Sequence, residues 1–231
     1  MPRVPTVARR LGPLLGLAAA LAALSACHDS TAAKSCYDYY GAGYAYDFNG
    51  DTSIVFHWPA SYMPLRVYAE SVGDLRADTK AGMDLWVSAF QCHEMSYTMV
   101  TDSTRADIVV RNPASLPAFV SRWMRAMHAD SAGACHGVTQ FETDSDTTAL
   151  VGPMRSYVAA FPAADSAAAA SCYHFVTAHE LGHALGLLSE SPNPGDLMFS
   201  SPTQLQLTDN DKYTIQYLYH VASRLGPPPR P

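Results

Sequence analysis

Short stretches of alternating apolar and polar residues predict several β-strands in the central part of the chain. Over residues 65–69, Leu65, Val67 and Ala69 alternate with an Arg and a Tyr, which is the pattern of a strand with one buried face. Four more strands are predicted, over residues 96–100, 106–111, 138–142 and 156–161. The chain is therefore expected to form a small sheet.

Helical spacing of apolar residues predicts three helices. The first covers residues 73–90. The longest covers residues 165–187, begins at an Asp or Ser that can cap it, and continues through Ala-rich sequence of high helix propensity. The last begins at Thr208, with Asp211 three residues further on in the arrangement of a capping box.

The first 26 residues have the pattern of an export signal. Three arginines precede an apolar stretch over residues 11–24, which is shorter than the roughly 20 residues that a membrane span needs. The tetrapeptide Leu-Ser-Ala-Cys that ends at Cys27 is similar to the lipobox of bacterial lipoproteins, in which the cysteine is lipidated. We expect an exported protein of the bacterial cell envelope, anchored by a lipid on Cys27, or secreted if the signal is an ordinary one.

The length of 231 residues suits one domain or two small ones. We predict a signal peptide over residues 1–26 and a polar, tyrosine-rich leader over residues 27–55. The folded domain is predicted over residues 56–222, and a disordered tail rich in Pro over residues 223–231.

Composition excludes two classes of protein. Apolar residues make up 48% of the chain, so it can bury a core and is not a disordered protein. The net charge is −6 and no cluster of Lys and Arg follows the first ten residues, which disfavours nucleic acid as a partner. We take a monomer as the default state.

Four cysteines remain if Cys27 is lipidated, and an even number in an exported protein suggests two disulfides. Three pairings are open. We favour Cys135–Cys172 together with Cys36–Cys92. A Cys/His metal site is disfavoured, because no C-x-x-C spacing is present.

The clearest chemical motif is HELGH at residues 179–183, within the longest predicted helix. His179 and His183 are four residues apart, so they share one face with Cβ atoms about 5–6 Å apart. Two imidazoles so placed can each lie about 2.0–2.1 Å from one Zn²⁺. Glu180 is then in reach of a metal-bound water, whose proton it can accept.

Further residues extend this motif. Gly186 completes H-E-x-x-H-x-x-G, and Met198 follows a loop rich in Pro and Gly. Together with the C-terminal helix, these features resemble the metzincins, and specifically bacterial matrixin-like metalloproteases, over residues 56–222. The resemblance implies that His179 and His183 bind zinc and that Glu180 is the general base. It also implies that Gly186 is the turn glycine and Met198 the methionine of the Met-turn.

The third zinc ligand departs from the family pattern. The motif H-E-x-x-H-x-x-G-x-x-H requires His where this chain has Ser189. Glu190 comes next, and one extra residue in the loop would bring its carboxylate to the ligand position. Carboxylates are competent zinc ligands. We favour Glu190, while Asp196, Ser189 and a water molecule stay open as alternatives.

The resemblance implies an α+β fold of the zincin type, with a small mixed sheet, an active-site helix and a C-terminal helix. It implies a zinc-dependent endopeptidase that acts on peptides or proteins; the alternative is a degenerate zincin-fold lipoprotein that serves as a binding module. A substrate could pair with an edge strand, which we predict at residues 156–160. Asp144 and Asp146 carry the oxygen ligands that calcium prefers, although a solvated acidic loop is the simpler interpretation.

Overall fold

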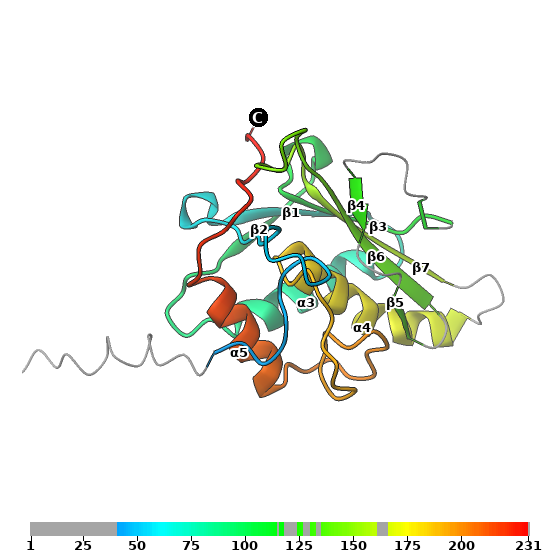
Figure 1. Ribbon diagram of the computed structural model, residues 1–231. Coiled ribbons are helices and arrows are strands. Elements are labelled where there is room, and N and C mark those ends of the chain that lie inside the picture. The colour runs from blue at the N-terminus through cyan, green and yellow to red at the C-terminus, as the bar shows by residue number, and fades with distance from the viewer. Residues whose placement is uncertain are drawn as a thin grey trace, which may run out of the picture. The chain divides into compact units, whose positions relative to one another are not determined.

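A computed structural model describes residues 41–114, 116–117, 124–126, 130–132, 135–160 and 166–230 (Figure 1). The chain divides into two units, residues 1–38 and residues 39–231, and every described residue belongs to the second. The predicted signal peptide, the lipidation site Cys27 and the disulfide partner Cys36 therefore lie outside the described residues.

Within the described part of the chain, seven strands form one mixed sheet. The strands are β1 (Leu65–Ala69), β2 (Tyr97–Val100), β3 (Ile108–Arg111), β4 (Met124–Ala126), β5 (Asp130–Ala132), β6 (Cys135–Glu142) and β7 (Met154–Ala160). Their order is β2-β1-β3-β7-β6-β4, and β5 also pairs with β6. Strands β1, β2, β3 and β7 are parallel, whereas β6 is antiparallel to each of its neighbours.

The predicted edge strand is placed wrongly. Strand β7 pairs with β3 on one side and with β6 on the other, so its backbone groups are used within the sheet. It is interior and cannot accept a peptide as a further strand. The outer side of β6 is paired over residues 135–137 with β5 and over residues 140–142 with β4.

Helices α3 (Leu75–Val87) and α4 (Ser166–Ala184) pack side by side against the sheet, and α5 (Asp209–Leu218) follows near the end of the chain (Figure 1). A Cβ atom at Gly82 of α3 would lie 2.8 Å from Cδ1 of Leu181 in α4. Gly82 therefore allows the two helices to approach closely. The predicted α+β fold with an active-site helix and a C-terminal helix is confirmed.

Two tryptophans fix α4 in the core. The indole nitrogen of Trp86 donates to the carbonyl oxygen of Ala178 at 2.8 Å, and that of Trp58 donates to the carbonyl oxygen of Ala184 at 2.9 Å. Both rings are almost fully buried. Because each ring buries a large apolar area and also satisfies its N–H group, it holds α4 in register as well as in place.

The folded domain begins before the predicted start at Phe56. Tyr44, Ile54 and Val55 are buried and belong to the main hydrophobic core. The main-chain N–H of Leu188 donates to the carbonyl oxygen of Tyr46 at 3.0 Å, so this segment contacts the loop that follows α4. The sequence analysis assigned these three core positions to the leader, because the segment is polar, rich in tyrosine and has no clear periodicity.

The prediction of a disordered C-terminal tail is wrong for residues 223–230. Leu225 is 2% exposed, and its N–H donates to the carbonyl oxygen of Val55 at 3.1 Å. Gly226 exchanges main-chain hydrogen bonds with Thr148 and Leu150. One apolar anchor and several backbone hydrogen bonds order a segment that has no periodic pattern of its own.

The end of this segment completes a buried charge cluster. The carboxylate of Asp107 accepts hydrogen bonds from Arg66 at 2.9 Å and from Arg230 at 2.8 Å. Burial alone would raise the pKa of Asp107, but the two guanidinium groups outweigh it and hold that pKa below its ordinary value.

None of the described helices combines the length and the apolar character that crossing a membrane requires.

Candidate active site

Helix α4 carries the three residues of the predicted zinc-peptidase motif. His179, Glu180 and His183 lie in its last turns, and all three are 0% exposed. The centroids of the two imidazole rings are 4.7 Å apart, with the ring planes at 87°. The spacing of four residues therefore brings both rings together, as the sequence predicts.

Each imidazole is oriented by a main-chain carbonyl group. Nδ1 of His179 lies 2.8 Å from the oxygen of Leu197, and Nδ1 of His183 lies 2.5 Å from the oxygen of Leu187. A carbonyl oxygen only accepts, so each Nδ1 donates, and in the neutral ring the lone pair is then on Nε2. This is the tautomer in which Nε2 binds a metal, with an outer hydrogen bond that fixes the ring.

The helix ends in a tight turn at Gly186. Gly186 has φ of +114°, a conformation that glycine adopts without strain, and its N–H donates to the oxygen of His183 at 2.9 Å. A Cβ atom at this position would overlap the carbonyl oxygen of Phe56. The turn places Leu187, whose carbonyl group orients His183, directly beside the end of the helix.

Met198 lies against α4 at Gly182. It is fully buried, and a Cβ atom at Gly182 would overlap its sulfur atom and would lie 2.6 Å from Cζ2 of Trp86. The glycine inside the HELGH motif therefore makes room for the methionine. The neighbouring Leu197 supplies the carbonyl group that orients His179.

The segment around Met198 is held by hydrogen bonds to Asp211, a role of that residue that the sequence did not indicate. The carboxylate of Asp211 accepts from the N–H groups of Leu197 at 2.9 Å and of Met198 at 3.3 Å, and from the hydroxyl of Tyr44 at 3.0 Å. Asp211 also forms the predicted capping box with Thr208. The capping pattern located Asp211, but no local signal shows its contacts with the turn.

Two of the alternative third ligands are engaged elsewhere. The hydroxyl of Ser189 donates to the carbonyl oxygen of Asp47 at 2.5 Å. The carboxylate of Asp196 accepts from the hydroxyls of Ser191 at 2.5 Å and Thr208 at 2.6 Å. Although burial raises the pKa of Asp196, these hydrogen bonds outweigh it and lower that pKa, so Asp196 acts as a loop anchor.

Glu190 lies in the same loop, and its Oε1 atom is shielded from solvent. Glu190 also interacts with other groups of the protein. Among the residues that the structure describes, no three His, Cys, Asp or Glu side chains are assembled into a complete metal-binding group. The structure thus brings the imidazoles of His179 and His183 together on α4.

Strand β6 contributes two further residues to the site. The hydroxyl of Thr139 donates to Oε2 of Glu180 at 2.6 Å. A Cβ atom at Gly137 would overlap Oε1 of Glu180 and would lie 2.6 Å from Cγ1 of Val176. Thr139 and Gly137 therefore define the space of the Glu180 carboxylate, and sequence reasoning identified neither residue.

The predicted disulfide Cys135–Cys172 is present, with Cα atoms 6.0 Å apart. It joins the first residue of β6 to α4. Cys92 is also disulfide-bonded, while Cys36, its predicted partner, lies outside the described residues.

The acidic loop that was considered for calcium is closed by its own hydrogen bonds. The carboxylate of Asp144 accepts from the N–H of Thr148 at 2.7 Å and from its hydroxyl at 2.6 Å. These hydrogen bonds lower the pKa of Asp144. The pattern is that of a polar turn.

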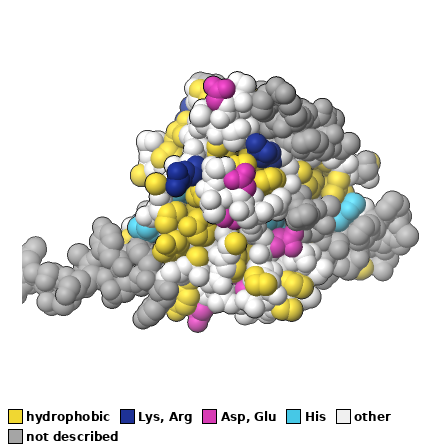
Figure 2. All heavy atoms as spheres, in the orientation of Figure 1, with side chains coloured by type: hydrophobic (Ala, Val, Ile, Leu, Met, Phe, Trp, Pro, Cys, Tyr) yellow, Lys and Arg dark blue, Asp and Glu magenta, His cyan; other side chains and the backbone are white. Residues whose placement is uncertain are grey.

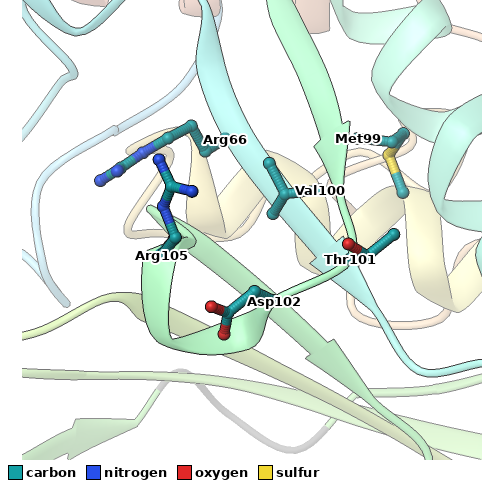
Figure 3. Close-up of a pocket in the computed structure, with 6 residues that line it drawn as sticks. All are labelled: Arg66, Met99, Val100, Thr101, Asp102 and Arg105. Atoms are coloured by element: carbon teal, nitrogen blue, oxygen red, sulfur yellow. The ribbon is translucent and has the colours of Figure 1, made fainter.

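A surface pocket lies at the end of β2, the edge strand that three strands separate from β6. It has a volume of about 270 Å³ and is lined by Arg66, Met99, Val100, Thr101, Asp102 and Arg105. In Figure 3 the two arginine side chains lie near each other, and Met99 lies on the other side. Arg66 is already paired with Asp107.

On the face shown in Figure 2, Lys and Arg are interspersed with Asp and Glu and form no basic patch.

The mixed sheet and the helices packed against it form the α+β arrangement of a zincin-type catalytic domain. The matrixin family model matches residues 74–220, which is more than half of the chain. The chain therefore belongs to the matrixin family, a family of metalloproteases that generally bind zinc. No curated protein matches the chain in sequence.

Proposed function

We propose that this protein is a zinc-dependent endopeptidase. The observation that carries the proposal is the pair of adjacent imidazoles on α4, each with Nδ1 held by a main-chain carbonyl oxygen. Glu180 is adjacent to the first of them. Membership of the matrixin family supports the reaction class.

His179 and His183 are the first two proposed zinc ligands, and Glu190 is the third. The hydroxyl group of Ser189 and the carboxylate of Asp196 hydrogen-bond to other parts of the protein. Glu190 follows Ser189 directly, and a carboxylate is a competent zinc ligand. Glu190→Ala should then weaken zinc binding by at least about tenfold, the scale of lost metal-site contacts. Glu190→His should bind zinc as well as the wild type or better, because it restores the ligand type of the family. Equal zinc affinity of the wild type and the alanine variant would contradict this ligand.

In the proposed reaction, the zinc ion would act as a Lewis acid that polarises the scissile carbonyl group and lowers the pKa of the attacking water. Glu180 accepts the proton of the attacking water and passes it to the nitrogen of the leaving amine. The hydroxyl group of Thr139 donates to Oε2 of this carboxylate at 2.6 Å. The products are a carboxylic acid and an amine, so one water molecule is consumed for each bond cleaved.

The test is digestion of a peptide library, with and without a chelator, by the wild type and by Glu180→Gln. An amide is nearly isosteric with the carboxylate but cannot accept the proton, so the variant should keep its zinc and lose about 10²–10⁴-fold in rate. Equal turnover by the two proteins would contradict the role of Glu180.

We also propose that the protein is exported and anchored by a lipid on Cys27, on the basis of the lipobox-like sequence. The acyl chains would bind the membrane by burying CH₂ groups, each of which contributes about 0.8 kcal/mol. Intact mass spectrometry of the protein from its native membrane tests this. The mass of the chain from Cys27 onward plus acyl groups is expected, and an unmodified chain would contradict it.

A further inference from the structure

A pair of buried hydroxyl groups lies directly beneath Glu180. Thr139 of β6 and Ser156 of β7 are cross-strand partners, with their oxygen atoms 2.9 Å apart. Thr139, Ser156 and Glu180 are all 0% exposed. The two strands thus present hydroxyl groups to the segment of α4 that carries the proposed general base.

The hydrogen positions follow from the available protons. Thr139 has one hydroxyl proton and two acceptors in reach, the main-chain oxygen of Glu180 at 3.0 Å and its Oε2 atom at 2.6 Å, of which Oε2 is the nearer and is charged. Thr139 therefore donates to the carboxylate, and Ser156 can donate to the oxygen of Thr139. A hydrogen bond to a charged acceptor is about twice as strong as one between neutral groups.

The opposite side of the carboxylate is limited by Gly137. Any side chain at this position would overlap Oε1 of Glu180. The carboxylate thus has Oε2 fixed by a donor and Oε1 in a space that exists because residue 137 is glycine. Gly137 and Thr139 both belong to β6, a strand against which α4 packs.

We propose that Thr139 is a positioning residue for Glu180: its hydroxyl group holds Oε2 and so fixes the orientation of the carboxylate that accepts the proton of water. This inference rests on the proposed function. A displacement of about 1 Å in a reacting group can cost on the order of 10²-fold in rate. The hydroxyl of Thr139 should therefore affect the rate of the chemical step and leave substrate binding unchanged.

Thr139→Val is the informative variant, because it keeps the volume and β-branched shape and removes the donor. We expect kcat to fall about 10–100-fold, with KM and zinc content unchanged. Thr139→Ser restores a donor and should recover most of the rate. Thr143→Val is the matched control, since Thr143 is a buried threonine just after β6 whose hydroxyl group has no hydrogen-bond partner among the described residues. It should retain the rate of the wild type.

The same substitution in a Glu180→Gln background separates positioning from a general structural effect. If Thr139 acts through the carboxylate, Thr139→Val should change the residual rate of Glu180→Gln far less than it changes the wild-type rate. An equal fractional loss in both backgrounds, or a wild-type kcat in Thr139→Val, would overturn the proposal.

Urea unfolding of the metal-free proteins gives a readout that does not depend on activity. Thr139→Val should reduce the free energy of unfolding more in the wild type than in Glu180→Ala, because the latter lacks the carboxylate and keeps only the main-chain oxygen as an acceptor. Equal costs would also overturn the proposal. A wild type without chelator-sensitive cleavage would contradict the proposed function and this role with it, whereas cleavage that Thr139→Val leaves intact contradicts this role alone.

Discussion

The disulfide between Cys135 and Cys172 should be a major source of stability, because it closes a large loop that contains most of β6, all of β7 and the start of α4. The bonded residues are 37 positions apart. In the chain-entropy model, the crosslink then removes about 13 cal/mol/K from the unfolded ensemble, which corresponds to about 4 kcal/mol at 25 °C. Replacing both cysteines with alanine should lower the free energy of unfolding by this amount.

The folded state adds a smaller contribution. Cys135 is 0% exposed and Cys172 is 5% exposed, and both pack against Val158 and Val176. Alanine at both positions removes two buried sulfur atoms and leaves space that the surrounding side chains fill only in part. The combined cost is expected in the upper part of the range of about 2–5 kcal/mol seen for native disulfides.

Equilibrium unfolding in urea measures this cost, with the fluorescence of the buried Trp58 and Trp86 as the signal. A reducing agent is a poor substitute for mutation, because Cys92 is disulfide-bonded as well and would be reduced too. A difference below about 1 kcal/mol between the double-alanine variant and the wild type would refute the reasoning, because loop closure alone predicts several times more.

Two further substitutions test other parts of the structure. Gly186→Ala places a side chain at φ of +114° and against the carbonyl oxygen of Phe56, so it should destabilise the protein by at least about 1–3 kcal/mol; wild-type stability in urea would contradict the turn. Asp107 has a pKa below its ordinary value of 3.8, so its carboxylate stabilises the fold above that pH, and this contribution is lost as the pH falls through the lowered pKa. Asp107→Asn should therefore be less stable than the wild type at pH 7, and its stability should fall less steeply below about pH 4 in acid titrations of unfolding. The same slope in both proteins would contradict the pairing of Asp107 with Arg66 and Arg230.

The features that could be predicted from the sequence are those with local causes. The spacing of four residues in HELGH places both histidines on one helical face, and the Thr208–Asp211 pair marks the start of α5. A Gly three residues after the second histidine indicated the turn. In each case the interacting groups are a few residues apart, so their geometry follows from the backbone period alone.

The contacts that escaped prediction join distant parts of the chain. Thr139 and Glu180 are 41 positions apart, and the Leu197–Asp211 hydrogen bond spans 14. Such pairs depend on which strand lies over which helix, and a single sequence does not show that register. Strands β4 and β5 have only three residues each, which is too short for an alternating pattern to be recognised.

The zinc content of the purified protein, measured together with peptide cleavage in the same sample, tests the central claim most directly. The account predicts one tightly held zinc ion per chain. A chelator should remove the metal and the activity together, and added zinc should restore both, while Glu180→Gln should keep the metal without the activity. A protein that holds no zinc and cleaves no peptide, with or without added metal, would contradict the account and favour a zincin-fold binding module.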